Sequence, residues 1–252
     1  MIYKKNFLRE VICRADFSNP SLNINPESLL LFKDKLGIPD VELKQNEIKS
    51  VELKLTANDP AFNIKTVGRS GTFLLNGGVE KIIIDPMSIS LTVNSYTDFK
   101  TFYDLFVKAF NTLLEVADIK EFKRLGLRYI NVFNNLPAIN TLADWSKYLY
   151  NSFISYYANI VMPDESFSLR RNMNNIIFSN GDYILSTNIG VWNDNFPGKI
   201  INQEFVLDLD CYIDNFILDP DEIIKRPLDM NSINTNFFNK IITSELKKIM
   251  DI

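Results

Sequence analysis

Two arginines and a glycine alternate along one predicted strand near the middle of the chain. In the strand Arg124–Phe133, Arg124, Gly126 and Arg128 point to one face, because successive side chains of a strand alternate between faces. Two guanidinium groups on one face can bind a phosphate or carboxylate through paired N–H donors. A glycine between them allows a ligand or a second backbone to approach closely. A ligand- or anion-binding face at Arg124, Gly126 and Arg128 is therefore one interpretation of the pattern.

Acidic side chains alternate in the same way on a later predicted strand, Gln203–Ile213. Asp208 and Asp210 share one face, and Glu204 lies on that face four residues before Asp208. Such carboxylates could hold Mg²⁺ for phosphoryl chemistry, with an arginine as the charge clamp. They could also pair with the two arginines, since arginine is the preferred partner in partly buried ion pairs. Internal ion pairs are the favoured interpretation, ahead of an anion site and of a metal site.

A third candidate is an aromatic pair in the predicted loop 190–198. Trp192 and Phe196 could form an exposed contact patch, because aromatic residues are enriched at interface hot spots. The alternative is that both rings anchor the loop on the sheet, which is the commoner use of loop aromatics. The sequence leaves both interpretations open.

The absence of histidine excludes several kinds of site. With no histidine in the chain, Ser-His-Asp triads, Cys-His pairs and histidine-ligated zinc sites are impossible. The two cysteines, Cys13 and Cys211, lie in apolar strand-like runs and are expected to be buried free thiols of a reducing, cytoplasmic compartment. No G-x-G-x-x-G follows a predicted strand, and we expect no cofactor.

The charge balance bears on the kind of partner. Residues 1–123 carry 16 basic and 16 acidic side chains, and the remainder supplies the whole net charge of -4. Domains that bind nucleic acid usually carry a basic excess. A nucleic-acid partner is therefore disfavoured, although a local basic patch stays open. No apolar run is long enough for a transmembrane helix, so no membrane association is expected.

Periodicity predicts the elements that position these residues. The first half reads as a strand, a short helix, further strands and a long helix. The second half reads as a strand, a helix, strands and a closing helix. The predicted strands are 7–17, 51–55, 81–84, 88–93, 124–133, 166–170, 176–178, 183–191 and 203–213. The predicted helices start at Pro26, before Phe99, at Thr141 and before Phe237. Thr97 or Ser95 is the expected cap of the second helix.

Two segments are assigned to irregular structure. Asp214–Met230 contains Pro220 and Pro227 and is expected to be a long loop or partial helix. Gly68–Gly71 is expected to be a bend between strands rather than a phosphate-binding loop.

The order of the elements predicts an α+β protein of two pseudo-repeated units, 1–122 and 123–252, which could also form one continuous domain. Each unit would be a strand, a helix, about four antiparallel strands and a helix. By analogy of topology alone, this order is that of helix-grip and TATA-box-binding proteins.

Short motifs distributed over nearly the whole chain resemble a sporadically distributed, uncharacterised prokaryotic family of similar length. Its central R-x-G-L-R-Y-x-N motif is present here as Arg124–Asn131, and its late L-D-L-D strand as Leu207–Asp210. The opening strand Leu8–Ile12 and the F-x-x-x-I-T helix end Phe238–Thr243 also fit. The family's patchy distribution resembles that of phage-defence or mobile-element genes, and the resemblance implies no activity.

The sequence favours a binding protein over an enzyme. We expect a non-enzymatic component of a multi-protein prokaryotic system, of phage-defence or mobile-element type, with a protein partner. The first alternative is a metal-dependent phosphoryl-transfer enzyme of nuclease or phosphatase type. The second is a nucleic-acid-binding saddle protein.

Overall fold

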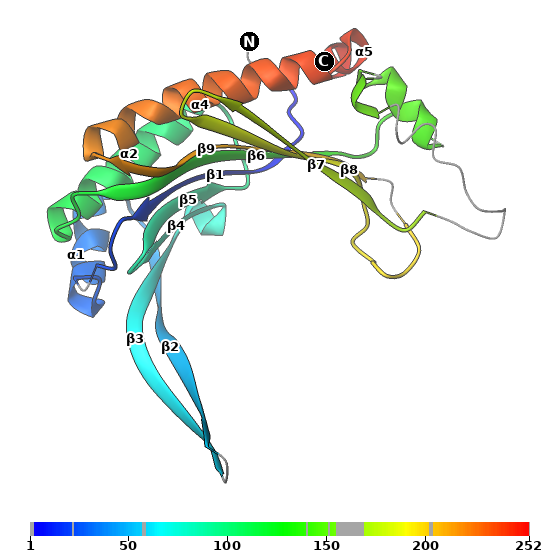
Figure 1. Cartoon of the computed structure of the whole chain (residues 1–252). Coiled ribbons are helices and arrows are strands. Elements are labelled where there is room, and N and C mark those ends of the chain that lie inside the picture. Colours follow the sequence, from blue (N-terminus) through cyan, green and yellow to red (C-terminus); the bar gives the residue numbers. More distant parts are fainter. Residues whose placement is uncertain are drawn as a thin grey trace. The chain divides into compact units, whose positions relative to one another are not determined.

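The computed structural model describes residues 3–21, 23–56, 59–139, 141–150, 152–154, 169–201 and 204–251. The chain is an α+β protein, as the sequence predicts (Figure 1). The elements are β1 (Leu8–Phe17), α1 (Pro26–Leu36), β2 (Glu42–Thr56), β3 (Asp59–Leu75), η1 (Asn76–Gly78), β4 (Glu80–Asp85), β5 (Ser88–Val93), α2 (Phe99–Val116), β6 (Phe122–Phe133), η2 (Leu142–Lys147), β7 (Asn172–Asn180), β8 (Tyr183–Trp192), β9 (Glu204–Leu218), α4 (Pro220–Ile241) and α5 (Ser244–Met250).

The chain divides into two compact units that exchange short segments. Unit 1 comprises Met1–Val11, Leu127–Ile213 and Leu228–Ile252, and unit 2 comprises Ile12–Gly126 and Asp214–Pro227. Strands β1, β6 and β9 and helix α4 therefore contribute residues to both units. No helix in the described part of the chain is long and apolar enough to cross a membrane.

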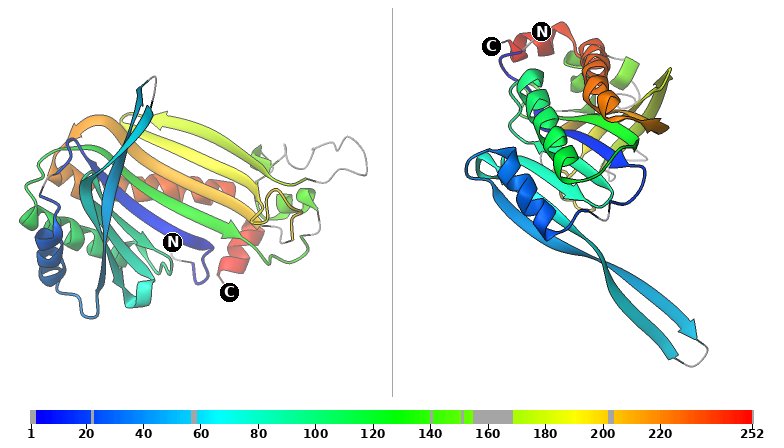
Figure 2. Two further views of the ribbon diagram at one scale, coloured as in Figure 1. Left: turned by 90° about the horizontal axis from the view of Figure 1, so that it is seen from below. Right: turned by 90° about the vertical axis from the view of Figure 1, so that its left-hand side faces the viewer.

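In unit 2 the strands follow the order β2-β3-β4-β5-β1-β6. The pairs β2/β3, β3/β4 and β4/β5 are antiparallel. Figure 2 shows β2 and β3 as a long twisted hairpin. Their register shifts once, between Ile48 and Lys49. The segment Gly68–Gly71 is part of β3, so the expected bend is wrong, and Arg69 pairs with Glu47 at 3.1 Å.

Helix α1 begins and ends at the residues that its sequence signals indicate. Asn25 forms a capping box with Ser28, and Gly37 closes the helix in the left-handed conformation at φ 59°. The helix packs on β3, where a Cβ at Gly71 would come within 2.8 Å of Leu29 Cδ2. Glycine at this strand position therefore allows the buried face of α1 to reach the sheet.

Helix α2 buries the aromatic stripe expected from its sequence. Phe102, Phe106 and Phe110 are all buried, and the Phe110 ring lies 5.2 Å from that of Phe122 on β6. The cap differs from the expectation. Asp98, rather than Thr97 or Ser95, accepts a hydrogen bond from the Thr101 backbone N–H at 2.9 Å. A carboxylate so placed also interacts favourably with the helix dipole.

In unit 1 the strand order is β1-β6-β9-β8-β7. The pairs β7/β8 and β8/β9 are antiparallel and run without a register shift. Helix α4 lies along one face of these strands (Figure 1). Its contacts include the stacked pair of Phe133 and Phe238, with ring centroids 6.4 Å apart, and the pair of Phe178 and Phe237, at 5.3 Å.

Two predicted segments of unit 1 differ from the expectation. A continuous helix from Thr141 is wrong in its described part, because the 3₁₀ helix η2 ends at Lys147 and Leu149 forms a β-bridge with Ile242. The rest of that predicted helix, 155–160, and most of the predicted strand 166–170 lie outside the described residues.

Of the two structures expected for Asp214–Met230, the long loop is wrong, whereas the partial helix is confirmed from Pro220 onward. Strand β9 continues to Leu218, and α4 begins at Pro220 and runs through Pro227. Asp219 and Glu222 bond to each other's backbone N–H groups, at 2.9 and 3.2 Å, and so cap this helix. Proline is favourable in the first helical turn, which explains the start at Pro220.

The α2 cap gives a test of the fold. The hydrogen bonds from Thr101 hold the pKa of the Asp98 carboxyl below its usual value, so its stabilising effect is present above the unfolded pKa and is lost as the pH falls through the folded pKa. We expect Asp98→Ala to lower the melting temperature at neutral pH, and the deficit to shrink as the pH falls towards about 3. Asp98→Asn should keep most of the cap, and Thr97→Ala, which removes only the weaker 3.3 Å bond to Asp98 Oδ2, should have a smaller effect than Asp98→Ala. Thermal melts followed by circular dichroism measure all three variants.

Candidate binding face of unit 1

The strands of unit 1 present different faces to helix α4 and to solvent. On the α4 side, Tyr129 Oη donates to Asn231 Oδ1 at 2.7 Å and Asn234 Nδ2 donates to the carbonyl oxygen of Leu127 at 2.9 Å. Because side chains alternate along a strand, Arg128 points to the opposite face. No helix among the described residues of unit 1 covers that face (Figure 1), which we call the open face.

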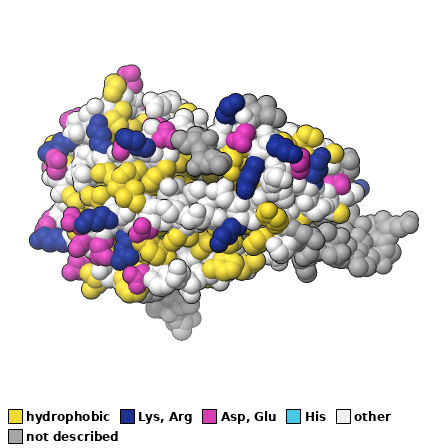
Figure 3. All heavy atoms as spheres, turned by 90° about the horizontal axis from the view of Figure 1, so that it is seen from above, with side chains coloured by type: hydrophobic (Ala, Val, Ile, Leu, Met, Phe, Trp, Pro, Cys, Tyr) yellow, Lys and Arg dark blue, Asp and Glu magenta, His cyan; other side chains and the backbone are white. Residues whose placement is uncertain are grey.

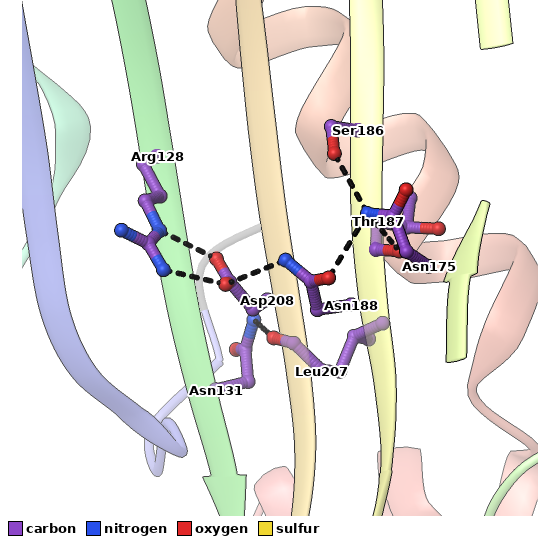
Figure 4. A network of polar contacts seen from close by, with 8 residues as sticks. All are labelled: Arg128, Asn131, Asn175, Ser186, Thr187, Asn188, Leu207 and Asp208. Atoms are coloured by element: carbon purple, nitrogen blue, oxygen red, sulfur yellow. Dashed lines mark hydrogen bonds and ion pairs between the residues drawn. The ribbon is translucent and has the colours of Figure 1, made fainter. Parts of the chain in front are cut away.

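A row of four hydrogen-bonded side chains crosses the open face, one from each of β6, β9, β8 and β7 (Figure 4). We call Arg128, Asp208, Asn188 and Asn175 the polar row. Asn188 lies directly opposite both Asp208 and Asn175 in the strand register. The row therefore follows the direction of the hydrogen bonds between strands.

The bonds of the polar row converge on one carboxylate. Arg128 donates through Nε to Asp208 Oδ1 at 2.8 Å and through Nη2 to Oδ2 at 2.7 Å. Asn188 Nδ2 donates to the same Oδ2 at 3.2 Å, and Asn175 Nδ2 donates to Asn188 Oδ1 at 2.9 Å. The arginine bond is bidentate, which is the strongest geometry for this pair.

This ion pair is important for stability because its carboxylate is buried. The Asp208 side chain is 7% exposed and that of Arg128 is 42% exposed, so the arginine covers a buried carboxylate. A buried charge is tolerated only where it is paired and hydrogen-bonded. The bond to Asp208 raises the pKa of Arg128, and Asp208, Asp210 and Glu10 add to the rise through their charges. Arg128 therefore keeps its positive charge beside the carboxylate.

A second cluster lies on the same face at the end of β8, two strand positions beyond Gly190. The guanidinium of Arg171 stacks over the Trp192 ring, 4.1 Å from its centroid, and lies 5.8 Å from the centroid of Phe196. Phe196 is 56% exposed. We call Arg171, Trp192 and Phe196 the aromatic platform.

The turn that carries Phe196 is held by one buried amide. Asn193 is 4% exposed. Its Nδ2 donates to the carbonyl oxygens of Arg170 at 2.8 Å and of Gly198 at 2.9 Å, and its Oδ1 accepts from the backbone N–H of Asn195 at 2.9 Å. The platform is therefore presented on an ordered turn, because both ends of the turn bond to the same side chain.

The three residues predicted to bind an anion all lie on β6, which spans the boundary between the two units. Arg128 belongs to unit 1, whereas Arg124 and Gly126 belong to unit 2. Arg124 has an interaction partner of its own. The bond between Arg128 and Asp208 is the internal ion pair that the sequence favours.

The carboxylates predicted as possible metal ligands interact with other groups of the protein. Both oxygens of Asp208 accept bonds from Arg128, and Asp210 also has a partner. Glu204 lies opposite Trp192 in the strand register, and its Oε1 accepts from Asn134 Nδ2 at 3.5 Å. Among the described residues, no three His, Cys, Asp or Glu side chains group so as to hold a metal ion.

The cysteines are buried free thiols, as the sequence predicts. Burial raises the pKa of Cys211 to about 12, with a smaller contribution from the charge of Asp210, and burial also raises the pKa of Cys13. A thiol with so high a pKa carries little nucleophilic thiolate at neutral pH. The two thiols therefore offer packing rather than chemistry.

Sequence reasoning missed the amides and one arginine of this face. The sequence did not single out Asn175 and Asn188 as site residues. Asparagine is common in this chain, and the strands that carry these two residues contain no motif. Arg171 lies one residue before β7, outside any motif. The available signal was register: the Asn180-Gly181 turn sets the pairing of β7 with β8 and so places Asn175 opposite Asn188.

No protein-family model matches this chain, and no curated protein matches it. The resemblance to the prokaryotic family therefore stays a prediction, carried by the motifs in the sequence alone.

The ion pair gives the second test. Arg128→Met leaves the buried Asp208 carboxylate without its main partner, and we expect a loss of about 2 kcal/mol in unfolding free energy. Arg128→Met combined with Asp208→Leu should recover most of that loss, because an apolar pair leaves no buried charge. Urea unfolding of the two variants measures this difference. Arg9→Met, which removes an exposed arginine of β1, is the matched control and should change little.

Proposed function

We propose that the chain is a non-enzymatic protein-binding module that contacts its partner through the aromatic platform on the open face of unit 1. The observation that carries the proposal is the stacking of Arg171 on Trp192 beside the exposed ring of Phe196. Arginine and aromatic side chains are the residues most enriched at the energetic centres of protein interfaces.

The geometry of the platform supports recognition at low entropic cost. Trp192 is the last residue of β8, and the turn after it is bonded to the Asn193 side chain through Asn195 and Gly198. Side chains already held in one arrangement lose little freedom when a partner binds. The stacked guanidinium also offers N–H donors at the rim of an apolar surface, a composition suited to a protein partner.

The polar row supports a binding role over a catalytic one. Its single carboxylate is held by a bidentate arginine and an amide. A general base or a metal ligand needs a carboxylate that can take up a proton or a cation. The row instead stabilises the sheet beneath the platform.

The wider setting and the finer fold are part of the proposal. A multi-protein prokaryotic system, of phage-defence or mobile-element type, rests on the resemblance of Arg124–Asn131 and Leu207–Asp210. A repeat of two similar units at 1–122 and 123–252 is supported by element order, since β1 to α2 and β6 to α4 each begin with a strand and end with a long helix.

The platform gives the third test. We expect Phe196→Ala to weaken partner binding about tenfold or more, as for an interface hot spot, while leaving the melting temperature unchanged because the ring is exposed. The tagged chain is used to capture partners from a lysate of its natural host, and native mass spectrometry identifies stoichiometric complexes. The affinity of the captured protein for each variant is then measured by calorimetry.

The control is Ile217→Ala, which removes an apolar side chain that is 74% exposed on β9 in unit 2. It should leave the affinity unchanged. The proposal fails if both variants bind equally well. It also fails if the purified chain shows robust turnover that Asp208→Asn abolishes. A nucleic-acid affinity that falls steeply with salt would contradict it as well.

A further inference from the structure

Strand β7 ends the strand order of unit 1 and exposes large apolar side chains. Ile176, Ile177 and Phe178 are 38%, 61% and 41% exposed. The strand pairs with β8 over its whole length without a register shift. Its outer edge therefore offers a regular row of backbone N–H and C=O groups to another strand. Exposed hydrophobic patches also lie between charged groups on the side shown in Figure 3.

Strand β7 lacks the charged side chains, the proline and the bulge that commonly protect a sheet edge. Monomeric proteins protect an edge with charged side chains, proline or a bulge. Asn172–Asn180 contains no charged residue and no proline. Strand β2, which ends the strand order of unit 2, has Lys44 beside Glu42 at 3.4 Å, Lys49 beside Glu47 at 3.8 Å, and a bulge. Among the described residues, the edge of β2 is thus protected and that of β7 is open.

We propose that β7 pairs antiparallel with β7 of a second copy of this chain, with the twofold axis at Ile177. In this register Ile177 lies opposite Ile177 of the second copy, and Ile176 lies opposite its Phe178. Asn175 lies opposite Ser179 of the second copy. Apolar side chains thus meet apolar ones and polar side chains meet polar ones, which is the arrangement that stabilises cross-strand pairs.

The two faces of β7 fit the same register. Phe178 packs on Phe237 of α4, with ring centroids 5.3 Å apart, so Phe178 and Ile176 lie on the helix side. Ile177 lies on the open face with Asn175, whose amide is bonded to Asn188. Pairing two copies would extend both the apolar helix side and the polar open face across the axis. Because β7 carries no charged side chain, it cannot pair with charges on a partner strand. A second β7 is also uncharged and therefore fits.

Sedimentation equilibrium of the full chain tests this inference. We expect the dimer to be populated as the protein concentration is raised to about 100 μM, because a complex of micromolar affinity forms in that range. Ile177→Lys places two ammonium groups opposite each other and should raise the dissociation constant at least about tenfold. Ile217→Lys, at a residue 74% exposed on β9, is the matched control and should leave the dimer intact. A wild-type monomer over this range, or a dimer equally stable in both variants, overturns the inference.

A crosslinking variant tests the register and does not depend on Ile177→Lys folding well. Residues directly opposite in an antiparallel pair have Cβ atoms close enough for a disulfide. Air oxidation of Ile177→Cys should therefore give a covalent dimer on a non-reducing gel, whereas Ile217→Cys should not. The native cysteines are buried and do not contribute. Equal crosslinking of the two variants, or none at Ile177→Cys, contradicts the proposed register.

Discussion

The buried carboxylate of Asp208 is the constraint on which unit 1 depends. A carboxylate that is 7% exposed requires a fixed cation and further donors. Arg128 on β6 supplies the cation and Asn188 on β8 supplies an amide. Because these bonds run across the strands, they fix which side chains share the open face. The opposite face is left to apolar residues and to the bonds between Asn234 and the β6 backbone.

The binding surfaces follow from this division of faces. Trp192 lies on the open face because it is an even number of positions from Asn188 along β8. The same register leaves β7 at the edge, with Ile177 on the open side and Phe178 on the helix side. A sheet made rigid by internal bonds can present both surfaces without rearrangement, which lowers the cost of association. The proposed binding role depends on this rigidity.

Local signals in the sequence predicted much of the fold and part of the site. Pro26 and Gly37 bracket α1 correctly, and the Asn180-Gly181 turn joins β7 to β8, because caps and turns depend on neighbouring residues. The pairing of Arg128 with Asp208 followed from alternation on two strands. For Asp214–Met230 the long loop is wrong and the partial helix is confirmed, because proline is tolerated at a helix start. Arg171 reaches Trp192 only through tertiary packing, for which no periodic pattern exists.

Hydrogen exchange measured by mass spectrometry, on the chain alone and in its affinity-captured complex, tests the central claim most directly. The account predicts that exchange slows on binding in the segment that carries Asn193 and Phe196 and in the peptide that begins at Arg171. The bonded strands β6 and β9 of unit 1 should already exchange slowly and should not change. Protection confined to elements of unit 2, or slow exchange gained in β6 and β9 instead of the platform, would contradict it.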